Sequence, residues 1–234
     1  MSAGQRWDTP RRTLDLELQR LQDEVLVLGS MVEQAIIESV DLLKRQDLEG
    51  ARKLIAADAL INEKRFAIEA DCLALIATQQ PAAGDLRILA AILEIVTELE
   101  RMGDYAKGIS RINLMMGSEP PLKPLIDIPR MAEKGRDMLH RALGAFVRRD
   151  VELARAIPKE DDEVDALYNR IYQELITFIM ADPRTLDRAT RLLWAAHNLE
   201  RFADRVTNIC ERVVFTVTGE MTEMDVKDAE QTGN

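Results

Sequence analysis

The chain has 234 residues, with 41 acidic against 31 basic side chains and a formal net charge of −10. Hydrophobic residues make up 47% of the chain but aromatic residues only 4%, a mixture that can build a core and favours helices over sheets. This acidic, aromatic-poor composition argues against binding to nucleic acid and is compatible with binding cations or basic protein surfaces.

The N-terminal residues 1–13 are polar and contain no apolar core, so we expect a flexible segment and no signal peptide. No apolar run reaches the roughly 18 residues of a membrane span, since the run 88–99 is short and contains Glu94. Cys72 and Cys210 are far apart and form no CxxC pattern, which favours buried, reduced thiols. We therefore expect a soluble cytoplasmic protein that contacts a membrane only indirectly.

Three helices are predicted in the first half of the chain. Apolar residues at spacings of three and four predict a helix over about 14–46. Asp47 is the expected N-cap of a second helix that ends near 78, because an aspartate can accept hydrogen bonds from the free amides of a helix start. A third helix with a similar apolar seam follows over about 86–116. Residues 14–116 are therefore expected to form a three-helix bundle.

A proline-rich segment divides the chain near its middle. Residues 117–129 hold four of the eight prolines, and proline cannot continue a helix, so we expect a linker over 117–128. A second three-helix bundle is predicted over 129–219, and the acidic, aperiodic tail 220–234 is expected to be disordered. The three helices of this bundle are expected at about 129–149, 150–180 and 185–218.

The two halves align as an internal repeat. DLEGAR at 47–52 aligns with DVELAR at 150–155, and ELERMGD at 98–104 aligns with NLERFAD at 198–204. We therefore predict an all-α fold of two tandem three-helix bundles related by duplication. Pro158 interrupts the match and is expected to kink the fifth helix or to delay its regular part.

Oxygen-bearing side chains recur at matching places in the two halves. Each third helix carries a glutamate followed four residues later by an aspartate, so the two carboxylates share one face and repel each other. Each second helix adds another pair at the same spacing, and antiparallel packing would place all four on one surface. The positions are Asp58, Asn62, Glu100 and Asp104 in the first half, and Asp161, Asp165, Glu200 and Asp204 in the second.

Two explanations of these pairs are open. In one, they are ordinary solvated positions on acidic helices, with Arg101, Arg201 or Lys107 available for salt bridges. In the other, they form metal sites, because a cation neutralises clustered carboxylates and oxygen ligands suit hard ions such as magnesium, manganese, calcium or iron. Recurrence in both halves favours metal, although duplication itself also copies residues.

The segments ELERMGDYAKGISR and NLERFADRVTNICERV resemble the paired signatures of the PhoU family of phosphate-specific transport accessory proteins. The resemblance runs from about residue 14 to 219 and includes the tandem repeat and the proline-rich linker. It implies two similar three-helix bundles whose E/D-x-x-x-D motifs can hold multinuclear metal clusters on the bundle surface.

The resemblance also implies which residues bind metal. Asn62 stands in place of a strict carboxylate, so we expect the first site to bind more weakly. Arg205 stands where many relatives have histidine, which argues against a nitrogen ligand there, whereas His197 could approach the second site. Oxygen ligands leave the metal open between iron, zinc, manganese and magnesium. The family's metal motifs fall on Asp161, Asp165, Glu200 and Asp204, and on Asp58, Glu100 and Asp104, with Arg101 and Arg201 inside the motifs.

The resemblance implies a negative regulator of phosphate uptake and of the phosphate-starvation response. Such a protein would be a cytosolic adaptor between a phosphate ABC transporter and a membrane sensor histidine kinase. The sequence has no glycine-rich phosphate loop, no G-x-S-x-G, no H-E-x-x-H and no E-x-x-H, so we do not expect an enzyme. The alternatives are a carboxylate-bridged metalloenzyme and a helical adaptor without metal. A homodimer is expected, because exposed seams on three-helix units often pair.

Overall fold

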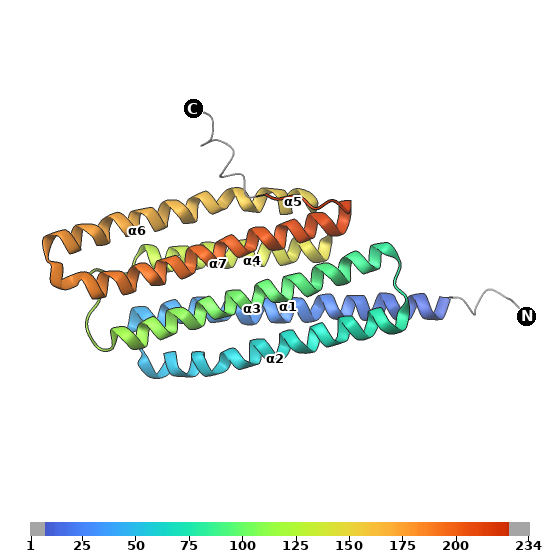
Figure 1. The fold of residues 1–234 in the computed structure, drawn as a ribbon, viewed down its shortest axis with the longest axis horizontal. Coiled ribbons are helices and arrows are strands. Elements are labelled where there is room, and N and C mark those ends of the chain that lie inside the picture. Colours follow the sequence, from blue (N-terminus) through green and yellow to red (C-terminus); the bar gives the residue numbers. More distant parts are fainter. Residues whose placement is uncertain (1–7, 225–234) are drawn as a thin grey trace, which may run out of the picture.

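The computed structural model describes residues 8–224, which form two groups of long helices lying side by side (Figure 1). The helices are α1 (Asp8–Arg45), α2 (Leu48–Gln79), α3 (Ala83–Met116), α4 (Asp127–Arg148), α5 (Val151–Ala156), η1 (Ile157–Glu160), α6 (Asp161–Ala181), η2 (Pro183–Thr185) and α7 (Leu186–Thr218). No strand occurs within this range. The predicted all-α fold of two tandem three-helix units is confirmed, with α1 to α3 in the first unit and α4 to α7 in the second.

The N-terminal boundary differs from the prediction. α1 begins at Asp8, so the boundary expected after 1–13 lies inside a helix. Arg11 lies in the added turn, and its guanidinium lies 2.9 Å from the Asp15 carboxylate one turn later and 2.5 Å from Asp85 near the start of α3. The pair with Asp15 lies within α1, and the pair with Asp85 connects the first turns of α1 to α3.

The predicted linker and tail lie at non-helical parts of the chain. Residues 117–126 join the two units without a helix. Of the predicted tail at 220–234, only 220–224 are described, and they form no helix. Residues 1–7 and 225–234 lie outside the described part of the chain.

The two units share a continuous interior. α3 packs against α7, and α1 packs against α4, whereas α2 and α6 lie on the outer sides of the molecule (Figure 1). The helices that carry the E-x-x-x-D pairs, α3 and α7, are therefore the central pair. Each contacts its own outer helix along one side and the other unit along another, so its carboxylates can meet those of α2 or α6.

Local signals place the outer helices as predicted. The Asp47 carboxylate accepts a hydrogen bond from the Gly50 amide at 2.8 Å, and the Asp150 carboxylate accepts one from the Leu153 amide at 3.0 Å. Both aspartates are thus N-caps, each satisfying an amide that has no partner within the helix. Cys72 is buried, as expected, and burial raises the pKa of its thiol to about 12.

Pro158 breaks the predicted fifth helix into α5, the 3-10 turn η1 and α6. Proline lacks an amide hydrogen and clashes with the preceding turn, so the α-helical pattern restarts only at Asp161. Glu160 at the end of this turn is bound by both terminal nitrogens of Arg141, at 2.8 and 2.7 Å, and by Lys134 at 2.6 Å. These bonds anchor the start of α6 to α4. Within residues 8–224, no helix combines the length and apolar character needed to cross a membrane.

Glu160→Gln is expected to lower the free energy of unfolding by about 1–3 kcal/mol at neutral pH, because it weakens a charge-assisted bidentate pair. Hydrogen bonds from Arg141 lower the pKa of Glu160 to about 2 from its ordinary 4.5. A carboxylate with a lowered pKa stabilises the folded state above its unfolded pKa, and this contribution is lost as the pH falls toward the folded value. In urea unfolding, the difference between the two proteins should therefore shrink as the pH falls from about 4.5 to about 2. A difference that does not change with pH would contradict this assignment.

Candidate functional site

The first-unit cluster joins α2 to α3. Asp58 is 6% exposed, and one of its oxygens lies 2.6 Å from the Lys107 ammonium. The same ammonium lies 3.3 Å from Asp104, and the Asn62 amide donates to Asp58 at 3.2 Å. The predicted residues therefore come together, but with a lysine that bridges the two aspartates. Lys107 therefore makes the kind of salt bridge that one of the two explanations from the sequence described.

Glu100 belongs to the same cluster. Its carboxylate lies 3.3 Å from the Arg65 guanidinium of α2. Burial raises the pKa of Glu100, and the nearby charges of Asp104 and Asp58 raise it further, whereas Arg65 opposes the shift. The α2 and α3 carboxylates therefore repel one another, and basic side chains of the same unit offset this repulsion.

The second-unit cluster joins α6 to α7. Burial raises the pKa of Glu200; His197 opposes the shift, and Asp165 and Asp161 add to it. Asp161 is only 5% exposed and begins α6 directly after the turn that contains Pro158. The predicted α6 aspartates thus lie close enough to Glu200 to affect its ionisation.

His197 lies beside this cluster, as one of the sequence alternatives proposed. Its Nδ1 atom lies 3.1 Å from the Glu200 Oε2 atom. That oxygen is buried and accepts no hydrogen bond of acceptable geometry, so the contact is an ion pair only when the imidazole is protonated. The histidine ring also lies 6.2 Å from the ring of Tyr168 on α6. A buried carboxylate oxygen without a hydrogen bond is the feature of this cluster that best fits a cation.

The two clusters differ in how well they fit a metal ion. Within residues 8–224, no three histidine, cysteine, aspartate or glutamate side chains converge closely enough to hold one ion. In the first unit, the Lys107 ammonium lies between Asp58 and Asp104, so that donor set does not fit a metal. In the second unit, Asp161 and Asp165 lie near enough to affect the Glu200 carboxylate, and His197 lies beside it. Carboxylates with an imidazole are donors whose chemistry suits a hard or borderline cation.

Neither motif arginine forms an ion pair with the predicted ligand glutamate beside it in the described part of the chain. Arg101 is exposed and pairs with Glu98 at 2.9 Å. Arg201 is also exposed, and its charge only slightly favours the ionised form of Glu200. Their supporting role remains a prediction. His140 on α4 lies 3.3 Å from Glu33 of α1, and neither of these residues belongs to the two carboxylate clusters.

A group of polar contacts joins α7 of the second unit to α3 of the first, and it was not predicted from the sequence. Arg205 lies 3.4 Å from Glu98 of α3 and donates a hydrogen bond to the Tyr105 hydroxyl at 3.4 Å. The Asn208 amide donates to the same Glu98 carboxylate at 3.2 Å. The sequence did hold a sign of this interaction, because the two halves differ at these positions. Glu98 aligns with Asn198, and Tyr105 aligns with Arg205. The side chains that connect the two units therefore lie at positions where the two halves of the repeat differ.

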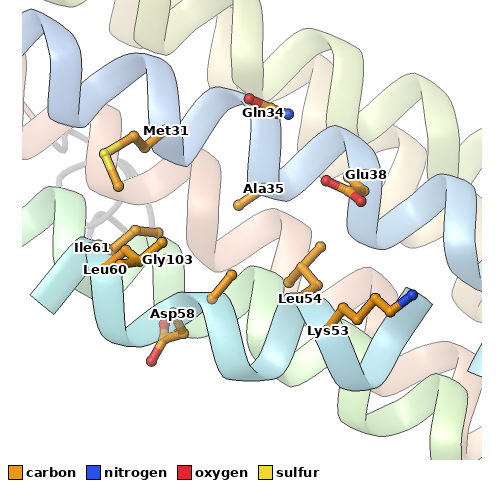
Figure 2. Close-up of a pocket in the computed structure, with 11 residues that line it drawn as sticks. Met31, Gln34, Ala35, Glu38, Lys53, Leu54, Asp58, Leu60, Ile61 and Gly103 are labelled. Atoms are coloured by element: carbon orange, nitrogen blue, oxygen red, sulfur yellow. The ribbon is translucent and has the colours of Figure 1, made fainter. Parts of the chain in front are cut away.

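A groove of about 330 Å³ opens between α1 and α2 next to the first-unit cluster (Figure 2). Met31 and Ala35 of α1 face Leu54 of α2 across it, whereas the Asp58 carboxylate points away from α1 (Figure 2). Gly103 of α3 also lines the groove. The groove is therefore mainly apolar, although Glu38 and Asp58 also line it.

Comparison with known proteins gives a consistent result for both units. Residues 25–112 and 128–213 match the PhoU domain family. A phosphate-specific transport system accessory protein PhoU homolog from Aquifex aeolicus is 36% identical over 207 residues, covering 88% of this chain and 94% of that protein. The Escherichia coli protein named phosphate-specific transport system accessory protein PhoU is 35% identical over 204 residues, covering 87% and 85%.

Solved structures give the same result. The phosphate transport system regulatory protein PhoU from Streptococcus pneumoniae superposes with a TM-score of 0.82 at 33% identity, covering 89% of this chain and 99% of that chain. PhoU from Pseudomonas aeruginosa also gives a TM-score of 0.82, at 32% identity, covering 88% and 99%. The likeness therefore extends over both units and the connection between them.

Proposed function

The chain belongs to the PhoU family, and from this premise we propose that it is a negative regulator of phosphate uptake and of the phosphate-starvation response. The observation that carries the proposal is the match of both units to the family, together with relatives named as accessory or regulatory proteins of phosphate transport. A regulatory role in phosphate transport follows from these names at the level of the family. The direction of regulation is our proposal.

The proposed mode of action is adaptor binding at the cytoplasmic face of the membrane, without catalysis. One partner is a phosphate ABC transporter and the other a membrane sensor histidine kinase, whose signalling the protein damps when phosphate is plentiful. Exposed apolar side chains on both outer helices support binding to proteins. Phe66 and Leu73 are 57% and 59% exposed on α2, and Tyr172 and Met180 are 45% and 80% exposed on α6. A homodimer remains a prediction, for which light scattering of the purified chain is the test.

The second-unit carboxylates are proposed to bind a metal ion, with iron, zinc, manganese and magnesium as the candidates. Asp161 and Asp165 of α6 would hold it together with Glu200 and Asp204 of α7. The buried Glu200 oxygen that accepts no hydrogen bond supports this assignment. A bound cation would supply positive charge to an acidic face, and the charge of that face affects which partner surface it accepts.

Deleting the gene in the organism of origin is expected to raise phosphate uptake and a phosphate-starvation reporter several-fold in phosphate-rich medium. The intact chain supplied from a plasmid should restore both to the starting level. The chain carrying an affinity tag should also recover the transporter ATPase subunit and the histidine kinase from crosslinked membranes. Unchanged uptake and reporter activity after deletion would overturn the regulatory proposal. Recovery of the transporter without the kinase would overturn the link to the kinase.

A further inference from the structure

We infer that Lys107 and Arg65 take the place of a metal ion in the first unit, so that only the second unit is a metal site. The starting observation is the Lys107 ammonium, which lies 2.6 Å from Asp58 of α2 and 3.3 Å from Asp104 of α3. It thereby connects the two helices that a shared cation would connect. Charge-assisted bonds of this length are among the stronger hydrogen bonds in proteins.

The other polar groups of the first cluster continue this pattern. Arg65 lies 3.3 Å from Glu100, and the Asn62 amide donates to Asp58 at 3.2 Å. Three carboxylates therefore meet two basic side chains that are covalently part of the same unit. An incoming metal ion would have to displace Lys107 from a carboxylate that is only 6% exposed. Repulsion between the ion and the two basic groups would oppose its entry.

The internal repeat provides a comparison within one molecule. When Glu100 is aligned with Glu200, Lys107 falls on Thr207. When Asp58 is aligned with Asp161, Arg65 falls on Tyr168 and Asn62 on Asp165. Thr207 is 5% exposed, and Tyr168 lies on α6 beside the ring of His197. At all three aligned positions, therefore, the first unit carries the more positive residue. This shared direction favours replacement of a metal over an incidental surface ion pair, which would contribute little to stability.

The inference rests on the metal binding proposed for the second unit. Its test uses a chain whose second unit has lost two of its four proposed ligands. The starting variant carries Glu200→Gln and Asp204→Asn. Into it we would introduce Lys107→Thr, Arg65→Tyr and Asn62→Asp, which copy the residues of the second unit. Binding of Mn²⁺ would be measured by isothermal titration calorimetry, and circular dichroism would confirm that each variant is folded.

We expect the copied residues to create Mn²⁺ binding at least about tenfold tighter than in the starting variant. Lys53→Thr is the control for the lysine alone, since it also replaces one lysine by threonine, on α2 at a side chain that is 76% exposed, and it should create no such binding. Lys107→Met, which keeps the aliphatic stem, provides a second variant if the threonine does not fold. It should raise Mn²⁺ affinity in the same direction.

Three results would overturn the inference. The first is Mn²⁺ binding by the starting variant that is lost on adding Glu100→Gln and Asp104→Asn, since the first unit would then bind metal with Lys107 present. The second is a folded Lys107 variant with no gain in affinity, and the third is an equal gain in the Lys53 control. If the unaltered chain binds no Mn²⁺, the proposal that the second unit binds metal is wrong. The inference for the first unit is still decided by the gain or its absence.

Discussion

Phe202→Ala is expected to lower the free energy of unfolding by about 3–5 kcal/mol, the range typical of removing a fully buried aromatic ring. Phe202 is 0% exposed and is among the largest fully buried side chains of the chain. Its ring packs directly on Gly135 of α4, where an added Cβ atom would lie only 3.0 Å from the ring. The glycine allows this close approach, so the surrounding structure has little freedom to fill the cavity that alanine would leave.

Urea unfolding followed by circular dichroism at neutral pH is the measurement for this variant. Trp194→Ala is the matched control, because it also removes an aromatic ring from α7 but at a position that is 51% exposed. The control should lose less than about 1 kcal/mol, as is usual for surface substitutions. Similar losses in the two variants would show that contact with Gly135 is not what holds α7 on α4.

The elements of this fold could largely be predicted from the sequence because they depend on local patterns. The caps at Asp47 and Asp150 and the break at Pro158 each follow from the chemistry of one residue and its neighbours on the chain. The partners of each helix could not be predicted in this way. Apolar spacing shows which face of a helix is covered, but not by which other helix. The packing of α3 on α7, which joins the two units, was therefore not anticipated.

The carboxylate clusters show the same limit. Helix geometry predicts that Glu200 shares a face with Asp204, and that His197 lies within reach of Glu200. The spacing does not say whether a basic residue of one helix reaches a carboxylate of another. Contact between Lys107 and Asp58 depends on the distance between α2 and α3 and on the lysine rotamer. The sequence ranked the first site as weaker because of Asn62, whereas the lysine bridge is visible only in three dimensions.

Glu200→Gln combined with Asp204→Asn is expected to weaken Mn²⁺ binding by on the order of 100-fold or more, since it removes two of the four proposed ligands, and supporting residues alone cost about 10–100-fold. Glu100→Gln with Asp104→Asn makes the same chemical change in the first unit. If Lys107 already neutralises that unit, this control should change Mn²⁺ affinity by no more than about twofold. Calorimetry on both variants, and elemental analysis of protein purified without a histidine tag, would measure the effect. Equal losses in the two variants would contradict the assignment of metal to the second unit.

The same pair of variants separates ligands from residues that merely support the fold. Burial and the like charges of Asp165 and Asp161 disfavour the ionised form of Glu200, whereas His197 favours it, so Glu200→Gln should change stability little in metal-free buffer. Because a ligand that binds only the folded state stabilises it, Mn²⁺ should raise the melting temperature of the unaltered chain and of the first-unit variant, but not that of the second-unit variant. A structural role would give the opposite result, with stability lost in the absence of metal. Lower affinity without lower stability is therefore the outcome that identifies these carboxylates as ligands.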